Sequence, residues 1–405
     1  MIQTKQSTAS RGEHMSVSRL PSWPHFDEDE ILSVTEVLRS GRVNYWTGEE
    51  VKNFEKEFAN HCGTEYGIAL ANGTVALELA LRSLGIGEGD EVIVTPRTFI
   101  ASASCIVMMG AVPVFADVDL DSQNITAASI QEVITPRTKA IITVHHAGYP
   151  CDMDPIMALA EKHGLVVIED CAQAHGAKYK GRPVGGLGHV AAFSFCQDKI
   201  MTTGGEGGML VTNSHDVWEQ SWSFKDHGKS YDAVYNRQYP AGFRWLHESF
   251  GTNWRMTEPQ GAIGRIQLKK LPEWHAKRNH NAARLTAHFA GIPALGVTRP
   301  PELITHAYYK YYINVMPELL KPNWNRDRIL TAITQEGVPC LTGTCPEIYL
   351  EKAFELTGLK PRERLPNAMR LGETSLVLLV HPTLTDADID FAAEVVKGVM
   401  SEASA

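Results

Sequence analysis

The chain has 405 residues, which is long for a single hydrophobic core and predicts a large domain with a smaller one. Hydrophobic residues make up 43% and charged residues 21%, a composition that excludes a mainly disordered protein. The formal net charge of −9 argues against a general nucleic-acid-binding protein, and no apolar run is long enough to span a membrane. The seven cysteines are an odd number and mostly lie in apolar runs, so we expect a reducing, cytoplasmic environment rather than disulfides.

The chain divides into three parts by its pattern. Residues 1–20 are polar and lack the apolar centre of a signal peptide, so we expect a disordered leader, with Met15 as an alternative start. Residues 21–260 form the expected large domain. Residues 261–405 form an expected linking helix followed by a smaller C-terminal α/β domain.

Short β-rich runs alternate with helical patterns from Tyr66 onward. Helices are expected from Gly73, from Thr98, near Ser129 and over DPIMALAEKHG, where Gly164 is a plausible end. The strand-like runs are YGIAL, EVIVTP, VPVFADV, KAIITVHH, LVVIED, HVAAFSFC and EGGMLVT. Alternation of this kind predicts a mainly parallel α/β sheet.

Beyond Met256, hydrophobic periodicity predicts helices and a strand. Between Met256 and about Ala290 the pattern is helical and rich in Lys, Arg and His, which is typical of a long exposed helix. Beyond it, AYYKYYINV predicts a strand, NRDRILTAITQEGV a helix that ends at Gly337, and ADIDFAAEVVKGVM a closing helix.

Residues that could bind a ligand or take part in a reaction follow several of these strands, at the positions where open parallel sheets bind ligands. The turn Asn72-Gly73-Thr74 precedes a helix, whose free amides favour a phosphate, although it also reads as an ordinary helix cap. Asp170 ends an apolar strand and needs a cation or strong donors, although a cap or an internal salt bridge would serve equally. Lys199 follows FSFCQD and precedes a glycine-rich stretch, although most lysines are simply solvated.

A phosphate turn, an acidic partner and a lysine at one sheet edge are together the contacts that pyridoxal 5′-phosphate (PLP) needs. At this point the sequence resembles the DegT/DnrJ-type nucleotide-sugar aminotransferases, a family of fold type I PLP-dependent enzymes. The resemblance runs from about Pro21 through seven segments in the family's order. They include ANGTVALELAL, TPRTF, IEDCAQAHGA, FSFCQDKIMTTGGEGGM and FGTNWRMTEPQGAIGRIQL.

The resemblance implies a mainly parallel seven-stranded sheet between helices and a set of cofactor contacts. Lys199 would form the internal aldimine with PLP, and Asp170 would pair with the pyridine nitrogen. The other implied contacts are Phe99 stacked on the ring, Gln173 beside the ring hydroxyl, and Ser194, Gly73 and Thr74 at the phosphate. Asn253 matches a phosphate contact from the neighbouring subunit, which implies a homodimer with a shared active site.

The implied reaction moves an amino group from L-glutamate, which leaves as 2-oxoglutarate, to a nucleotide-linked keto-sugar at carbon 3 or carbon 4. Surface polysaccharide (lipopolysaccharide O-antigen) or amino-sugar biosynthesis would use the product. Related dehydratases carry histidine where this chain has Lys199, which disfavours that branch. A PLP-dependent dehydratase and a PLP-binding regulatory protein without turnover stay open as alternatives.

Other polar residues are open to more than one interpretation. The segment from Lys225 to Arg255 would form a substrate and dimer loop or merely a solvated basic surface; its basic residues are Lys225, Lys229, Arg237, Arg244 and Arg255. No metal site is expected at His145-His146, since neighbours on a strand point to opposite faces, or at Cys340 and Cys345. We expect His175 to satisfy a buried hydrogen bond rather than to move protons. Glu206 and Cys196 have no assigned role.

Overall fold

A computed structural model describes residues 19–405, so the expected leader lies outside the described residues except for Arg19 and Leu20. Its centre is a seven-stranded sheet in the order β1-β9-β8-β5-β4-β2-β3. The strands are β1 (Tyr66–Leu70), β2 (Glu91–Val94), β3 (Val112–Phe115), β4 (Thr138–Val144), β5 (Val166–Asp170), β8 (Val190–Ser194) and β9 (Gly208–Thr212). Only β9 runs against its neighbours, so the expected mainly parallel seven-stranded sheet is confirmed.

Helices cover both faces of this sheet because its strands are apolar on both sides. One face packs against α2 (Glu50–Cys62), α5 (Ala127–Val133) and α6 (Met153–His163), through residues such as Phe54 and Ile156. The other face packs against α3 (Gly73–Ser83), α4 (Ala101–Met108) and α7 (His215–Phe224), through residues such as Leu77 and Trp222. The expected helices are therefore present, although α4 begins three residues after Thr98.

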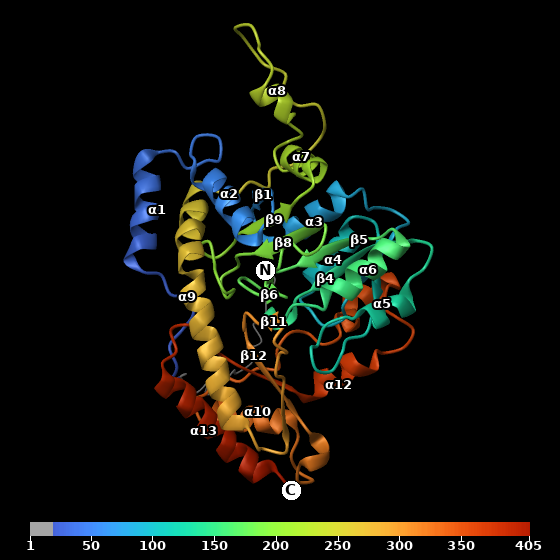
Figure 1. Ribbon diagram of the computed structural model, residues 1–405, viewed down its shortest axis with the longest axis vertical. Coiled ribbons are helices and arrows are strands. Elements are labelled where there is room, and N and C mark those ends of the chain that lie inside the picture. The colour runs from blue at the N-terminus through green and yellow to red at the C-terminus, as the bar shows by residue number, and fades with distance from the viewer. Residues whose placement is uncertain (1–18) are drawn as a thin grey trace, which may run out of the picture.

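The expected linking helix is α9 (Glu258–Phe289), which spans the molecule from the large sheet to the C-terminal part (Figure 1). Its start is fixed by a capping box, in which the Thr257 amide donates to Gln260 Oε1 at 2.9 Å. It packs beside α1 (Glu28–Ser40), α2 and α13 (Asp386–Ala403). A Cβ on Gly264 would lie 2.6 Å from the Phe54 ring, so this glycine permits the close approach of α2.

The C-terminal part has its own antiparallel sheet and core. The sheet has the order β10 (Leu295–Val297), β12 (Tyr311–Val315) and β13 (Ser375–Leu378). It is covered by α9, α10 (Arg326–Gln335) and α13, and its core includes Ile313, Ile329 and Val396. A further small sheet joins β6 (Lys178–Tyr179), β7 (Arg182–Pro183) and β11 (Ile304–Thr305).

The remaining described elements are three short α-helices and three 3-10 helices. The α-helices are α8 (Tyr231–Tyr235), α11 (Lys352–Thr357) and α12 (Pro366–Thr374), and the 3-10 helices are η1 (His146–Gly148), η2 (Pro317–Leu319) and η3 (Ile348–Leu350). Tyr349 and Phe354 pack into the core of the large sheet although they come late in the chain. The division near residue 260 stays a prediction. Within residues 19–405, no helix combines the length and the apolar character that a membrane crossing needs.

The strand expected over AYYKYYINV is shorter than predicted, because it begins only at Tyr311. The residues before it bond elsewhere: the Ala307 amide donates to Gly148 O and the Tyr309 amide to Ala147 O, both at 2.9 Å. Tyr308 between them has a φ of 46°, which breaks the extended conformation. This irregular segment brings Tyr309 to the carboxyl edge of the large sheet.

Candidate active site

The turn before α3 is held against the end of β8. Asn72 caps the helix, since its Oδ1 accepts from the Val75 amide at 3.0 Å, and the amides of Gly73 and Thr74 lie in the half-buried first turn. A Cβ on Gly73 would lie 2.6 Å from Ser194 Cβ. Glycine is therefore required for this contact, which brings Gly73, Thr74 and Ser194 together as an amide-rich and hydroxyl-bearing cradle suited to a phosphate.

Asp170 ends β5 at the same edge of the sheet and is buried. Its Oδ2 accepts from Ser102 Oγ at 2.7 Å and its Oδ1 from the Ala172 amide at 3.0 Å. Within residues 19–405 no basic side chain forms an ion pair with it, so its partners are all neutral donors. A buried carboxylate in this position is well placed to stabilise a cationic ring nitrogen.

Lys199 lies on a loop that is fixed at several points. The Phe195 amide donates to Gly207 O at 2.8 Å, and the Lys199 amide donates to Cys196 O at 3.1 Å. Trp23 Nε1 donates to Lys199 O at 2.8 Å, and Lys199 Nζ lies 5.0 Å from the centre of the Tyr309 ring. The backbone of Lys199 is thereby held while its ammonium group rests on an aromatic face.

Phe99 and Gln173 come from the loops after β2 and β5. The Phe99 ring is 64% exposed, which leaves an aromatic face available for a flat ligand. Gln173 is buried, and its Oε1 accepts from the Ala147 amide at 2.8 Å, which leaves its amide hydrogens to donate.

His175 lies close to Lys199 and is buried, and its expected buried hydrogen bond is represented only by a weak contact with the backbone of Ser194. Its ring packs against Phe193 and Phe195 at 5.4 and 5.6 Å, and neither ring nitrogen forms a hydrogen bond of standard geometry with another residue of the 19–405 range. Burial, and then the neighbouring Lys199 charge, lower the pKa of His175 to about 3. His175 is therefore neutral at physiological pH, and its ring acts as apolar packing behind the Lys199 loop.

Asn253 does not join this group within one chain. Its side chain is exposed, and its Oδ1 accepts only from the Arg255 amide at 3.4 Å. The next residue, Trp254, lies beside the turn before α3, because its carbonyl accepts from the Ala71 amide at 2.9 Å.

The basic residues of the 225–255 segment are mostly paired. Lys225 is fully buried and its Nζ lies 2.7 Å from Glu55 Oε1, so both interpretations, a basic substrate and dimer loop and a solvated basic surface, are wrong for this residue. Lys229 and Arg255 both pair with Asp226, at 2.9 and 2.7 Å. The charges of these basic residues are therefore neutralised by glutamate and aspartate side chains. The sequence pattern did not predict that these acids lie nearby.

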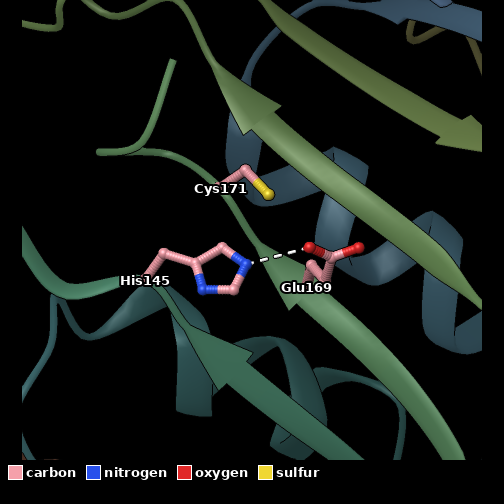
Figure 2. A group of neighbouring side chains, drawn as sticks. All are labelled: His145, Glu169 and Cys171. Atoms are coloured by element: carbon pink, nitrogen blue, oxygen red, sulfur yellow. Dashed lines mark hydrogen bonds and ion pairs between the residues drawn. The ribbon is translucent and has the colours of Figure 1, made fainter. Parts of the chain in front are cut away.

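His145, Glu169 and Cys171 form a buried group whose ligand atoms lie close enough for a metal ion (Figure 2). His145 Nε2 lies 2.9 Å from Glu169 Oε2, and its Nδ1 accepts from the Cys151 amide at 3.0 Å. Glu169 also accepts the backbone amides of Gly185, Leu187 and Gly188. Both ring nitrogens are thus engaged, and the group serves as a hydrogen-bond network that ties the 185–188 loop to β5.

Sequence reasoning missed three residues of the site. Ser102, which bonds Asp170, lies within the TPRTFIASAS segment and could have been inferred from its place after a parallel strand. Trp23 and Tyr309 gave no such signal, because they reach Lys199 from positions more than 100 residues away.

A mainly parallel seven-stranded sheet of this order, with an amide-rich turn, a buried carboxylate and a lysine at its carboxyl edge, is the fold type I architecture of PLP-dependent aminotransferases. The chain belongs to the DegT/DnrJ/EryC1/StrS aminotransferase family, whose model matches residues 24–398.

Several named proteins and solved structures are similar to this chain over most of its length. An aminotransferase structure from Psychrobacter cryohalolentis is 56% identical, with a TM-score of 0.93 over 95% of this chain and 99% of that one. GDP-perosamine synthase of Caulobacter vibrioides is 38% identical over 91% of this chain and 94% of its own length. The spore coat polysaccharide biosynthesis protein SpsC of Bacillus subtilis is 37% identical over 94% and 97%.

Family membership confirms PLP as the cofactor, since similar solved structures include PLP and PMP forms of a sugar aminotransferase. The residues at the sheet edge fit this cofactor. The cradle that a Cβ on Gly73 would fill suits a phosphate, and the Asp170 carboxylate lacks a cationic partner among residues 19–405. Lys199 supplies an amine beside them.

Proposed function

We propose that this chain transfers an amino group from L-glutamate to carbon 3 or carbon 4 of a nucleotide-linked keto-sugar. The similarity to GDP-perosamine synthase supports a nucleotide-linked substrate. The similarity to a spore coat polysaccharide biosynthesis protein supports a role in surface polysaccharide or amino-sugar biosynthesis. We place the reaction in the cytoplasm, in keeping with seven cysteines that are all free.

The observation that carries the proposal is the buried Asp170 carboxylate, which has only neutral donors among residues 19–405 and lies at the same sheet edge as the Lys199 loop. When bound, PLP supplies an electron sink for the bonds to the donor's alpha carbon. Asp170 would keep the pyridine nitrogen protonated, and Ser102 would orient the carboxylate through its 2.7 Å hydrogen bond.

The other residues would hold the cofactor and move one proton. Gly73 and Thr74 would donate backbone amides to the phosphate and Ser194 a hydroxyl, while Phe99 would cover the ring and Gln173 would donate to its hydroxyl. Lys199 would link covalently to PLP at rest. Once a donor amine replaces it, the free Lys199 amine would carry the proton that leaves the donor's alpha carbon.

We also propose a homodimer in which Asn253 contacts the phosphate bound by the partner subunit. The exposed position of Asn253 supports this, since its side chain is free to meet another chain. The segment between α8 and α9 projects from the body (Figure 1). It exposes Phe243, Trp245 and Phe250, whose exposed fractions of 76%, 77% and 98% favour a covered position in an assembly.

The test supplies ¹⁵N-L-glutamate and a panel of UDP-, GDP- and dTDP-linked 3-keto and 4-keto sugars to the holoenzyme. We expect one sugar to acquire ¹⁵N, detected by mass spectrometry, with one 2-oxoglutarate released for each amine transferred. Loss of a sugar hydroxyl without amine incorporation would instead support the dehydratase alternative. Glutamate left unchanged by the holoenzyme would overturn the proposal.

A further inference from the structure

A pocket of about 280 Å³ lies where the large sheet meets the C-terminal part. Five stretches of chain meet there: residues 20–23, the Lys199 loop, α9, the segment before β12 and the segment after β13. The charged and aromatic side chains of its lining are Trp23, Asp198, Arg278, Tyr309, Lys310 and His381.

Lys199 is not itself a lining residue of the pocket, but two lining residues contact it. Trp23, on one wall, donates from Nε1 to Lys199 O at 2.8 Å. Tyr309, on another wall, lies under both ammonium groups, with its ring centre 5.0 Å from Lys199 Nζ and 4.9 Å from Lys310 Nζ. A small ligand in the pocket would therefore lie within one side chain of Lys199, the residue that we propose to carry the cofactor.

The lining has more cations than acids. Arg278 is 1% exposed, and its Nη1 donates to the carbonyls of Tyr308 and Tyr309 at 3.2 and 3.3 Å. Its Nε has no hydrogen-bond partner, and within residues 19–405 no carboxylate pairs with it. A buried guanidinium without an acid is costly, so an anion from solution would be stabilised here.

Lys310 and His381 also lie on the wall of this mostly cationic pocket. Lys310 Nζ lies 3.9 Å from Asp198 Oδ2, the oxygen that also accepts from the Tyr309 hydroxyl, so the single acid of the lining is shared. His381 is 4% exposed, its Nδ1 lies 2.8 Å from Thr383 Oγ1, and its Nε2 has no hydrogen-bond partner in the part of the chain that the structure describes. Burial, followed by the charges of Arg278 and Lys310, lowers the pKa of His381 to about 3, so its ring is neutral.

We propose that this pocket binds a carboxylate of the amino donor, with Lys310 and Arg278 as its charged contacts. The size of the pocket suits a small dicarboxylic amino acid better than a nucleotide diphosphate, since nucleotide-sized ligands need larger clefts. The proposal rests on the proposed function, because it assumes a donor whose amine reaches Lys199.

The test measures ligand affinity and the two half-reactions separately. Glutarate, a dicarboxylate without an amine, is titrated into the holoenzyme by calorimetry. The L-glutamate half-reaction is followed by absorption, and the keto-sugar half-reaction is followed from the PMP form. The variants are Lys310→Gln, Lys310→Arg, which keeps the charge, and Lys397→Gln as a matched control on α13, where Lys397 forms an ion pair with Glu394.

We expect Lys310→Gln to weaken the binding of glutarate and to raise the L-glutamate concentration at half-maximal rate, each by about 10- to 100-fold. This is the range for the loss of one charged hydrogen bond. Lys310→Arg should restore most of the affinity for glutarate, and Lys397→Gln should bind glutarate as tightly as the wild type. The keto-sugar half-reaction should be unchanged in all three variants. Retained PLP absorption in each variant excludes misfolding as the cause.

Three outcomes would overturn the pocket assignment. In the first, wild-type holoenzyme does not bind glutarate. In the second, Lys310→Gln binds glutarate as wild type does. In the third, only the keto-sugar half-reaction slows, which would assign the pocket to the diphosphate. Failure of the proposed function has a different signature: no half-reaction with L-glutamate in the wild type, whatever the glutarate affinity.

Discussion

Asp170 and Glu169 are neighbours on β5 with different surroundings. Successive side chains on a strand point to opposite faces, so the two carboxylates are separated by the sheet. Glu169 bonds His145 and three backbone amides, whereas Asp170 bonds Ser102 and one backbone amide. Glu169 therefore anchors the end of the strand, and Asp170 is left available to a cofactor.

The Asp170→Asn variant tests the proposed role of the charge. Asparagine keeps the shape of the side chain and can still accept from Ser102, but it cannot stabilise a protonated ring nitrogen. We expect the L-glutamate half-reaction to slow by about 10- to 100-fold, measured by stopped-flow absorption. Ser102→Ala, which keeps the charge, should have a smaller effect, and a wild-type rate in Asp170→Asn would count against the assignment.

The Glu169→Gln variant tests the buried network. Removing one partner of a buried pair should lower the free energy of unfolding by about 3–5 kcal/mol, measured by chemical denaturation. Glu394→Gln, at an exposed surface pair, should cost no more than about 1 kcal/mol.

The stabilisation by Glu169 should also depend on pH. Burial raises the pKa of Glu169, but the hydrogen bond from His145 and the backbone amides outweigh it, so the pKa is lowered. Its contribution is therefore present above the unfolded-state pKa of about 4.3 and is lost as the pH falls through the folded-state value. The stability difference between wild type and Glu169→Gln should shrink in acid, and a constant difference would contradict this account.

At the scale of elements, the turn before α3 depends on one glycine. In Gly73→Ala the added Cβ would meet Ser194 Cβ at 2.6 Å, so the turn or β8 must shift. We expect the PLP dissociation constant to rise about tenfold or more, measured by equilibrium dialysis.

Gly398→Ala is the matched control for this change. Gly398 lies within α13 and a Cβ there would meet nothing within 4 Å. Its PLP affinity should equal the wild type, with the unfolding free energy raised by about 0.5–1 kcal/mol because alanine favours the helix. Equal PLP affinity in both variants would show that the Gly73 contact does not shape a phosphate site.

Elements with strong local patterns could be predicted, and those set by distant contacts could not. The sheet strands and α9 have clear periodic runs and capping residues, and they form where expected. The run before Tyr311 reads as a strand, but bonds from Ala307 and Tyr309 to the segment after β4 override its propensity. In the site, the carboxyl-edge positions of Asp170, Ser194 and Gly73 follow from the chain order, whereas the pairing of Lys225 with Glu55 depends on packing across 170 residues.

At the scale of the whole molecule, a shared active site predicts complementation between two inactive variants. Lys199→Ala lacks the proposed cofactor lysine, and Asn253→Ala lacks the proposed contact to the partner's phosphate. Each alone should be inactive or nearly so. In a mixed dimer one site would combine the intact Lys199 of one chain with the intact Asn253 of the other.

Subunit exchange of equal amounts should thus recover about a quarter of the wild-type activity, because half of the dimers are mixed and half of their sites are intact. The activity is measured after mild dissociation and reassembly, with each variant treated alone as a control. No recovery, or a fully active monomer in sedimentation, would rule out the shared site.

We propose that Lys199 carries PLP and releases it to an amino donor. The absorption spectrum of the purified holoenzyme before and after L-glutamate, beside that of Lys199→Ala, tests this role. We predict a band near the visible edge that disappears with L-glutamate and is absent from the variant. A protein that binds no PLP, or a variant whose band and response match the wild type, would contradict the claim.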